Sequence, residues 1–240
     1  MGVLLEKDCE ICVNNCCAVC VEEHQSSVFS ILPKEDLDIL MENKQEISFK
    51  PGETILKQNT SSTHVVCIKK GIAKVYIEGV KGRCLILKLI SDLDFITGGG
   101  IFANHTRHFT VTAITDVECC LINSEQILKL FSKNSEFALE ILKHHNYQNN
   151  QYLSSLINLT QKYMPGRVAD SILYLKNKIF KTNSFQIPLT RQELSDMSAM
   201  TKESYVRILK EFKNSGIIKP NGNSMEILDE DALISISRNG

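Results

Sequence analysis

The sequence predicts an α+β protein in which an N-terminal antiparallel β-roll is followed by a long helix and a C-terminal winged helix-turn-helix. Three observations predict this order. Short β runs separated by glycines fill the chain from Ile47 to Ile122, as in a sandwich or roll of antiparallel strands. The chain from Ser135 to about Tyr163 contains no Pro or Gly. Residues 190–215 carry two capped helical patterns separated by a tight turn.

Composition places the chain among globular proteins. It has 240 residues, of which 43% are hydrophobic, and this is enough for one large domain or two modest ones. No apolar run approaches the roughly 20 residues that cross a bilayer. The N-terminus is charged and has no apolar core of a signal peptide. We therefore expect a cytoplasmic protein without a membrane partner.

The β-roll is predicted from runs of β-branched and aromatic residues with turn residues between them. The turns are indicated by Pro51-Gly52, Gly71, Gly79, Gly82 and the triple glycine at 98–100. The predicted strands are Val65–Ile68, Ile72–Ile77, Cys84–Ile90, Phe109–Ile114 and Val117–Ile122. A short helix from Pro33 to Met41 precedes this region, and a helix from Ser124 to Ser132 follows it.

The long helix is predicted to form a dimer. A single helix of this length is seldom stable alone, and the same helix of a second subunit would cover its apolar side. We expect that side to be formed by Phe137, Ile141, Tyr152, Leu156, Leu159 and Tyr163. Pro165-Gly166 interrupts the helix, and a new helix is expected at Arg167–Ile179. The predicted units are a Cys-rich arm (1–28), a β-roll (29–133), a dimerisation helix (134–164) and a DNA-binding domain (165–240).

The strongest local signal is the helix-turn-helix. After a short β run at Phe185–Leu189, Thr190 and Glu193 form a capping box that starts a helix over Arg191–Met197. Ser198-Ala199-Met200 is the turn, and Thr201 caps a second helix that ends near Asn214. A β wing is expected where Ile217-Ile218 and Met225–Leu228 flank residues 219–223.

The second of these helices has two unlike faces. Tyr205, Ile208, Leu209 and Phe212 form one apolar stripe. The opposite face is basic, as a reader of the DNA major groove requires. The candidate DNA-contacting residues are Arg191, Thr201, Lys202, Glu203, Val206, Arg207, Lys210 and Lys213. From Met164 to Pro220 ten Lys or Arg stand against five Asp or Glu, which favours an anionic partner. The alternative is an ordinary amphipathic helix with a solvated charged face.

These motifs resemble the Crp/Fnr family of transcription regulators over residues 30 to 238. The stretch "IPLTRQELSDMSAMTKESYVRILKEFKNSGIIK" resembles the family's winged helix. The stretch "PGETILKQNTSSTHVVCIKKGIAKVYIEGVKGRCLILKLI" resembles its cyclic-nucleotide-binding-like jelly roll. The resemblance implies a homodimer that binds double-stranded promoter DNA and acts with RNA polymerase, and it gives base contacts to Glu203 and Arg207. Lys202, Val206 and Ala199 depart from the residues that are common in the family. If the position of Ala199 needs a positive φ, that backbone is strained.

The effector pocket departs from the cyclic-nucleotide members of the family. Those members hold ribose with a Glu and phosphate with an Arg followed by Ser or Thr. In the matching stretch "DFITGGGIFANHTRHFTVTA", Arg107 is in place, but His108 replaces the hydroxyl residue and glycine stands where the Glu is needed. We therefore do not expect cAMP. Gly98, Gly99, Arg107 and His108 remain the candidate effector pocket, either as an anion-binding nest or as a turn that has lost the ligand.

The cysteines indicate a different kind of sensor. Five of the nine lie within twelve residues, at Cys9, Cys12, Cys16, Cys17 and Cys20, a pattern that indicates metal or redox chemistry in a reducing compartment. By resemblance to Fnr-type members, three arm cysteines and Cys120 would hold a [4Fe–4S] cluster, for which four thiolates are needed. The predicted ligands are Cys9, Cys12, Cys20 and Cys120, with Cys16 or Cys17 as alternatives for the third arm ligand.

Other interpretations of the cysteines and histidines remain open. Zinc could use Cys9-x2-Cys12 with Cys17-x2-Cys20. Haem could use one of the histidines at 64, 105, 108, 144 and 145. A thiol switch needs no metal at all. The β-run cysteines at 67, 84, 119 and 120 could be small buried hydrophobic residues.

The sequence contains no P-loop, dinucleotide fingerprint or Ser/His/Asp order, so we do not expect an enzyme. We expect a sequence-specific DNA-binding transcription regulator whose DNA affinity follows an effector or a redox state. The alternatives are sensing of another small molecule or of a haem-bound gas, and a ligand-binding module that acts without DNA.

Overall fold

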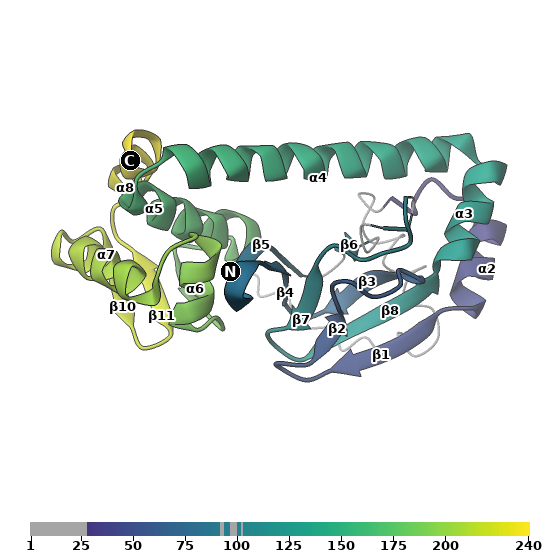
Figure 1. The fold of residues 1–240 in the computed structure, drawn as a ribbon, viewed down its shortest axis with the longest axis horizontal. Helices are drawn as coiled ribbons and strands as arrows, with labels where there is room; N and C mark the ends of the chain where they lie inside the picture. The colour runs from purple at the N-terminus through teal and green to yellow at the C-terminus, as the bar shows by residue number, and fades with distance from the viewer. Residues whose placement is uncertain (1–27, 92–93, 97–99, 102) are drawn as a thin grey trace, which may run out of the picture.

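The computed structural model describes residues 28–91, 94–96, 100–101 and 103–240. Two units are joined by one long helix, α4 (Ser135–Gln161), which runs along the whole molecule (Figure 1). The β-roll lies under one end of α4, and the C-terminal helical unit lies at the other end (Figure 1). The predicted order of β-roll, long helix and winged helix-turn-helix is thus confirmed.

Two four-stranded antiparallel sheets form the β-roll, with strand orders β1-β8-β3-β6 and β2-β7-β4-β5. Their strands are β1 (Gln45–Phe49), β2 (Thr54–Leu56), β3 (His64–Lys70), β4 (Ala73–Glu78), β5 (Cys84–Ile90), β6 (Phe95–Ile96), β7 (Thr110–Ala113) and β8 (Val117–Asn123). The five predicted strands are present within one or two residues. β2 and β6 were not predicted because two or three residues give no measurable alternation, and β1 was not predicted either.

Alternation along β3 and β8 separates two cores. Side chains that point between the sheets, including Val66, Ile68 and Cys119, form the inner core. Their neighbours Val65 and Ile122 point to the outer face, where they pack with the helices α2 (Lys34–Glu42), α3 (Ser124–Lys133) and α4. The period of two in a strand produces this division. The outer face of β3 and β8 around Val65 and Ile122 is therefore a helix-covered core rather than a solvated surface.

The long helix α4 presents apolar residues on two different sides. Asn134 caps its start by accepting a hydrogen bond from the amide of Phe137 at 3.0 Å. Phe137 and Ile141 are buried against the β-roll, whereas Leu156 and Tyr163 are 58% and 78% exposed. The prediction that a second subunit would cover this side is therefore wrong for Phe137 and Ile141, because the β-roll covers them. The exposed apolar residues of α4 include Leu139, Leu142, Leu153, Leu156 and Ile157.

The helix break falls earlier than predicted. α4 ends with Lys162 as its C-cap, and α5 (Met164–Tyr174) starts at once with Pro165 in its first turn. Proline is tolerated there because the first amides of a helix have no intrahelical partner. Gly166 therefore lies inside α5, where it lies against the main chain of Gly240 so closely that a Cβ would be 2.9 Å from the carbonyl carbon of Gly240.

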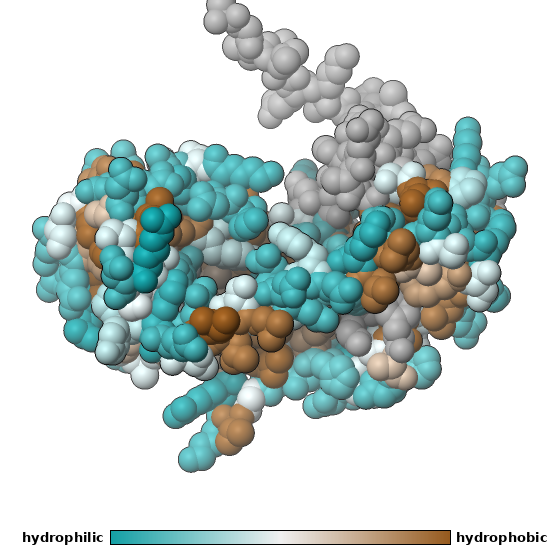
Figure 2. Space-filling model, turned by 90° about the horizontal axis from the view of Figure 1, so that it is seen from above, coloured by the Kyte–Doolittle hydropathy of each residue, from teal (hydrophilic) through white to brown (hydrophobic). Residues whose placement is uncertain are grey.

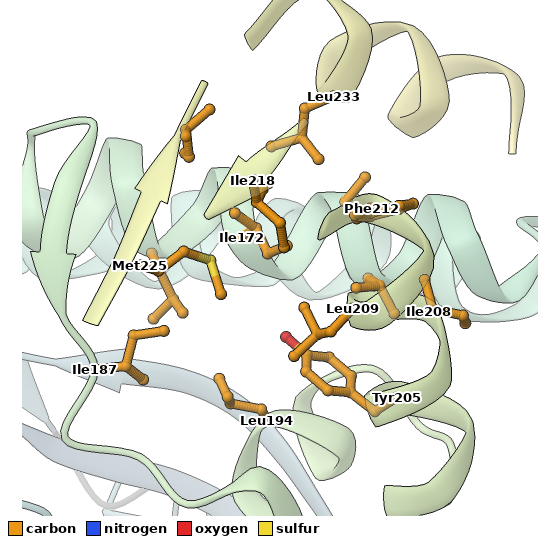
Figure 3. Close-up of a cluster of buried hydrophobic side chains, with 14 of the residues drawn as sticks. Ile172, Ile187, Leu194, Tyr205, Ile208, Leu209, Phe212, Ile218, Met225 and Leu233 are labelled. Carbon is orange, nitrogen blue, oxygen red and sulfur yellow. The ribbon is translucent and has the colours of Figure 1, made fainter. Parts of the chain in front are cut away.

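The C-terminal unit packs helices on a small sheet. After α5 come η3 (Leu175–Phe180, a π-helical segment), β9 (Ser184–Gln186), α6 (Arg191–Met197), α7 (Lys202–Asn214), β10 (Ile218–Asn221), β11 (Ser224–Ile227) and α8 (Glu230–Asn239). The strands form an antiparallel sheet of order β10-β11-β9. The core is filled from all of these layers, with Ile172, Leu194, Tyr205, Ile218, Met225 and Leu233 meeting at its centre (Figure 3). The helix α8 was not predicted.

No helix among the described residues is at once long enough and apolar enough to span a membrane.

Candidate nucleic-acid interface and sensor sites

The helix-turn-helix begins with the predicted capping box. The amide of Glu193 donates to Thr190 Oγ1 at 3.2 Å, and the amide of Thr190 donates to Glu193 Oε2 at 2.7 Å. These two bonds satisfy amides that a helix start leaves without partners. Thr201 caps the start of α7 with a single bond, by accepting from the amide of Ser204 at 3.2 Å. The starts of both helices are therefore defined by hydrogen bonds between residues three positions apart.

The turn between the helices has a strained residue at its centre. Ala199 has φ +48°, a left-handed conformation that is costly for a residue with a Cβ. Arg167 of α5 crosses to this turn, and its Nη1 donates to the main-chain oxygens of Ala199 at 3.2 Å and Ser198 at 3.4 Å. Ser198 itself is fully buried. The strained turn is thus held from α5, a contact that nothing in the local sequence indicated.

The helix α7 separates a buried face from an exposed one. Tyr205, Ile208, Leu209 and Phe212 are at most 5% exposed (Figure 3), and the Tyr205 hydroxyl lies 3.2 Å from Ser171 Oγ. Six residues of the opposite side are exposed, and we call them the recognition face. They are Lys202, Glu203, Val206, Arg207, Lys210 and Lys213. Because four side chains of the inner face are buried in the core of the C-terminal unit, the recognition face has a fixed orientation.

Three of the candidate DNA-contacting residues already make hydrogen bonds or ion pairs within the chain. Arg207 Nη1 lies 3.1 Å from Glu211 Oε1, an exposed pair one helical turn apart. Arg191 donates to the main-chain oxygen of Gly222 at 3.0 Å, so it ties α6 to the β10–β11 turn. Thr201 is used in its cap. Arg191 and Thr201 thus have hydrogen-bond partners within the chain, and they stay predicted DNA contacts beside the recognition face.

The wing is the β10–β11 hairpin. Its register pairs Asn221 with Ser224, and Gly222 takes φ +58° in the turn, which favours glycine. Lys219 and Pro220, predicted as loop, instead lie in β10. The hairpin projects beside α7 in the C-terminal unit (Figure 1), as a wing does beside a recognition helix.

Arg107 of the candidate effector pocket is held by the chain around residue 60. Its amide donates to the Thr60 oxygen at 2.9 Å, and its Nη1 donates to Thr60 Oγ1 at 3.0 Å. Burial lowers the pKa of the guanidinium, and its Nε is buried without a hydrogen-bond partner. His108 is exposed. Gly98 and Gly99 lie outside the described residues.

Gly100 shows why glycine is needed near this pocket. A Cβ at this position would be 1.9 Å from the Thr106 oxygen, a distance that no side chain can occupy. The amide of His105 donates to the Gly100 oxygen at 2.8 Å. Gly100 therefore allows two backbone segments to approach closely in a tight loop next to Arg107.

The β-roll cysteines point in different directions. Cys119 belongs to the core between the sheets, and burial raises the pKa of its thiol to about 12. Cys120 therefore points to the outer face, where it is directly opposite Cys67 in the β3–β8 register. Cys67 packs against the outer core together with Val28 and Ile31. The chain that leads out of the Cys-rich arm thus packs on the same face as Cys120.

The predicted arm ligands Cys9, Cys12, Cys16, Cys17 and Cys20 lie outside the described residues. Within the described part of the chain, no group of three or more His, Cys, Asp or Glu side chains could hold a metal ion. Any site that uses Cys120 therefore needs ligands from elsewhere.

Two histidines of α4, His144 and His145, are partly buried among other side chains. His144 lies against the ring of Phe95, with 5.8 Å between ring centroids, and its Nε2 is 3.0 Å from Gln148. Burial lowers the pKa of both His144 and His145. His64 Nδ1 is 2.9 Å from the hydroxyl of Thr63. His64 and His144 therefore both have polar partners within the chain.

A charged contact joins the two units. Lys74 of β4 lies 2.6 Å from Glu193 of α6, and each side chain is only 19% exposed. Tyr174 of α5 adds hydrogen bonds with the amide and the oxygen of Leu89 at 2.9 and 3.2 Å. Ile86 and Leu89 of β5 join the core of the C-terminal unit. The helix-turn-helix is therefore packed directly on the β-roll.

The fold and the recognition face together define a DNA-binding transcription regulator. The chain matches the model of the cyclic nucleotide-binding domain over residues 46–134 and that of the Crp-like helix-turn-helix domain over residues 166–236. These two domains in this order show that the chain belongs to the Crp/Fnr family of transcription regulators. Members of this family regulate transcription and are not enzymes.

Relatives extend over nearly the whole chain. A CRP-like cAMP-activated global transcriptional regulator of Mycobacterium tuberculosis is 21% identical over 218 residues, covering 89% of this chain and 97% of the relative. The transcriptional activator FnrL of Cereibacter sphaeroides is 23% identical over 226 residues, covering 91% and 90%. The matches therefore include both a cAMP-activated regulator and an Fnr-type activator.

Solved structures show the same fold. FixK2 from Bradyrhizobium japonicum has a TM-score of 0.74 at 18% identity, covering 80% of this chain and 96% of that one. A Crp/Fnr-family transcriptional regulator from Thermus thermophilus has a TM-score of 0.66 at 18% identity, covering 81% and 99%. At these identities the likeness concerns the fold, and the effector must be argued from this chain's own residues.

Proposed function

We propose that this protein is a homodimeric regulator that reads promoter DNA with α7 and controls its DNA affinity through a [4Fe–4S] cluster held by the Cys-rich arm and Cys120. The DNA-binding part rests on one observation, the recognition face. It combines four basic residues with one carboxylate on the exposed side of a helix whose other side is buried. We divide the chain into arm (1–28), β-roll (29–133), dimerisation helix (134–164) and DNA-binding domain (165–240).

The recognition face suits the major groove by its chemistry. Arg207 can donate two bonds to a guanine, and Glu203 can accept from a cytosine amino group. Lys210 and Lys213 lie further along α7, where their ammonium groups would meet phosphates. To reach a base, Arg207 must leave Glu211, which is an exchange of exposed partners with little cost. A second subunit would place its α7 in a successive major groove about 34 Å away.

The dimer is supported by the exposed side of α4. Leu139, Leu142, Leu153, Leu156 and Ile157 are each about half or more exposed. In the view onto the α4 side, hydrophobic side chains gather in separate groups between hydrophilic ones (Figure 2). Packing the same helix of a second copy against this side would remove these residues from water. RNA polymerase is the further partner that we expect for such a regulator.

The residues of the sensor fit an iron–sulfur cluster in donor type. Such clusters are held by cysteine thiolates, and the arm carries five cysteines within twelve residues. Val28 follows Cys20 by eight positions, and this stretch spans at most about 28 Å when extended. Val28 packs against the same outer core as Cys67, and Cys67 is directly opposite Cys120. Cys9, Cys12 and Cys20, with Cys16 or Cys17 as alternatives, would then join Cys120 as ligands.

The chain offers a route from the arm to the dimer helix. Phe29, the second described residue after the arm cysteines, makes an edge contact with Phe95 at 5.2 Å and lies 5.8 Å from Phe137 of α4. When bound, the cluster would supply iron–thiolate bonds that tie the arm to Cys120. An arm held in this way would fix Phe29, and with it the start of α4.

The test of the sensor is iron and sulfide analysis of anaerobically purified protein. We expect brown protein that loses its colour in air, and an iron content that falls in the C120S variant. C119S and C67S are matched controls in the same two strands and should keep the iron. Colourless anaerobic protein without iron would overturn the cluster. A cluster that survives in C120S but not in C67S would move the ligand to Cys67.

DNA binding is tested by a gel shift with promoter fragments at several salt concentrations. Salt-sensitive retention of specific fragments supports the proposal. If no fragment is retained in any redox state, the alternative of a ligand-binding module without DNA is favoured. Protein that contains zinc but no iron would favour a zinc site over the cluster. The absorption spectrum of haem would favour a haem sensor. Titration with cAMP should give no binding heat, because no ribose-binding Glu stands at the matching position.

A further inference from the structure

A cavity lies between α4 and the neighbouring elements, near the junction of the two units. Its volume is about 510 Å³, within the range of pockets that hold small organic ligands. β5 forms one wall with Lys88 and Leu89, α4 forms another with Tyr152 and Leu159, and α5 and α6 close it with Arg167 and Met197. The cavity is distinct from the Arg107 loop and from Cys120, neither of which lines it.

The walls combine apolar side chains with charges that are not balanced. Lys88 donates to the neutral amide oxygen of Gln148, and Arg167 donates only to main-chain oxygens. Neither cation forms an ion pair with a described residue. Asp170, in contrast, is paired with Lys162 at 2.8 Å and accepts from Ser237. Asp94, the other lining carboxylate, accepts from the amide of Ser91 at 2.8 Å.

Two further observations concern these cations. Burial lowers the pKa of Lys88, and the charge of Asp94 opposes this effect. The Nε of Arg167 is buried and has no hydrogen-bond partner. A buried donor without an acceptor is costly, and an anion in the cavity would satisfy it.

Arg167 also links the cavity to the DNA-binding element. The same guanidinium whose Nε lacks a partner holds Ser198 and Ala199 through Nη1. These two residues form the strained turn directly before α7. A ligand bound to Nε would fix the position of the guanidinium and therefore the hydrogen bonds that hold the turn.

We propose that this cavity binds an organic anion with an apolar body, such as an aromatic or aliphatic carboxylate or sulfonate, and that Lys88 and Arg167 hold its charge. Leu89, Leu159 and Met197, with the ring of Tyr152, contact its apolar part. Because Arg167 holds the turn before α7, occupancy of the cavity stabilises one orientation of the recognition face. The site would thus be a second input to DNA binding, independent of the cysteines.

The probe is 8-anilinonaphthalene-1-sulfonate, an aromatic anion whose fluorescence rises in apolar surroundings, added to the full-length protein. We expect saturation at about one probe per chain, as typical of a single pocket. K88M and R167Q should each weaken binding about tenfold, the effect of losing one charged hydrogen bond. K129M, which removes an exposed lysine from α3 on the β-roll, is the matched control and should bind like the parent.

Two further measurements keep the test decisive if a charge variant folds poorly. S155W places an indole in the cavity from α4 and should abolish probe binding while the protein keeps its circular dichroism and its unfolding transition. Hydrogen exchange of a peptide covering residues 195–205 should slow when the probe binds to the parent, and not in R167Q. Absence of probe binding in the parent overturns the site. Binding that K88M, R167Q and S155W leave unchanged also overturns it.

Discussion

The ammonium of Lys74 in the β-roll lies 2.6 Å from the carboxylate of Glu193, which also closes the capping box of the first helix of the helix-turn-helix. One carboxylate thus fixes a helix start and attaches it to the other unit. Burial raises the pKa of Glu193, but the hydrogen bonds from Lys74 and Thr190 outweigh burial, so the pKa is lowered overall. The helix-turn-helix and the β-roll therefore share an interaction that depends on the charge of one residue.

Replacing Lys74 tests this attachment. The K74M variant should lose about 1–3 kcal/mol in the free energy of unfolding, because it leaves a half-buried carboxylate without its cation. Urea denaturation followed by circular dichroism measures the loss. K57M is the control, because the Lys57–Glu78 pair lies in the same sheet but is exposed. If K57M and K74M shift the urea midpoint equally, the Lys74–Glu193 contact contributes no more to the free energy of unfolding than an exposed ion pair.

Substitutions on the recognition face should separate specificity from affinity. R207A is expected to cost about 1–3 kcal/mol of binding free energy and to relax the preference at one base pair. K210A and K213A should weaken all DNA sequences similarly and reduce the dependence of binding on salt. Binding of each variant to a randomised set of sites at two salt concentrations shows both effects. Equal weakening of every sequence by R207A would contradict its role as a base reader.

The turn residue Ala199 should be improved by glycine. Glycine adopts a positive φ without a Cβ penalty, so A199G should stabilise the protein by roughly 0.5–1 kcal/mol. The thermal midpoint measured at neutral pH shows the change. A169G in the buried part of α5 is the control, where the same substitution should destabilise. A lower midpoint for A199G would mean that the Cβ of Ala199 contributes contacts that outweigh the strain.

Stability should decline as the solution becomes mildly acidic. Burial lowers the pKa of His144 and His145 in the folded protein. Above the unfolded value of about 6.5 both states are neutral, so this effect is absent there. As the pH falls below that value, only the unfolded state gains protons, and the free energy of unfolding decreases.

Urea denaturation at pH 7.5 and pH 5.5 measures this decline. H145Q should make the difference between the two pH values smaller, since glutamine does not titrate. H108Q, which changes an exposed histidine, should leave the difference as it is. A parent protein that is equally stable at both pH values would contradict the lowered pKa values.

The exposed side of α4 should be required for dimerisation. L153E places a charge on a side chain that is 59% exposed in the single chain, and burial of that charge in a dimer is unfavourable. Sedimentation should show monomers for L153E and dimers for the parent. Q151E, which adds the same charge two residues away in the same helix, is the control. A dimeric L153E would place the dimer contact elsewhere.

The sequence determined those features that depend on neighbours within a few residues. The capping box at Thr190, the cap at Thr201, the buried stripe from Tyr205 to Phe212, and five strands of the β-roll were predicted, because each rests on a short period or on a bond over three residues. The positive φ at Ala199 was anticipated from a missing glycine. The direction of Cys119 and Cys120 to opposite faces also follows from the period of two.

Only the tertiary structure decided which surfaces meet. The β-roll covers Phe137 and Ile141, while Leu153 and Leu156 stay exposed. The sequence pattern of α4 does not distinguish these two sets, because both recur with helical spacing. The contact of Lys74 with Glu193 joins residues 119 positions apart, and that of Arg167 with Ala199 joins residues 32 apart. Local periodicity carries no information about such pairs, since they form only when packing brings the units together. The cavity between α4, α5 and β5 arises in the same way, from three elements whose sequences show no sign of it.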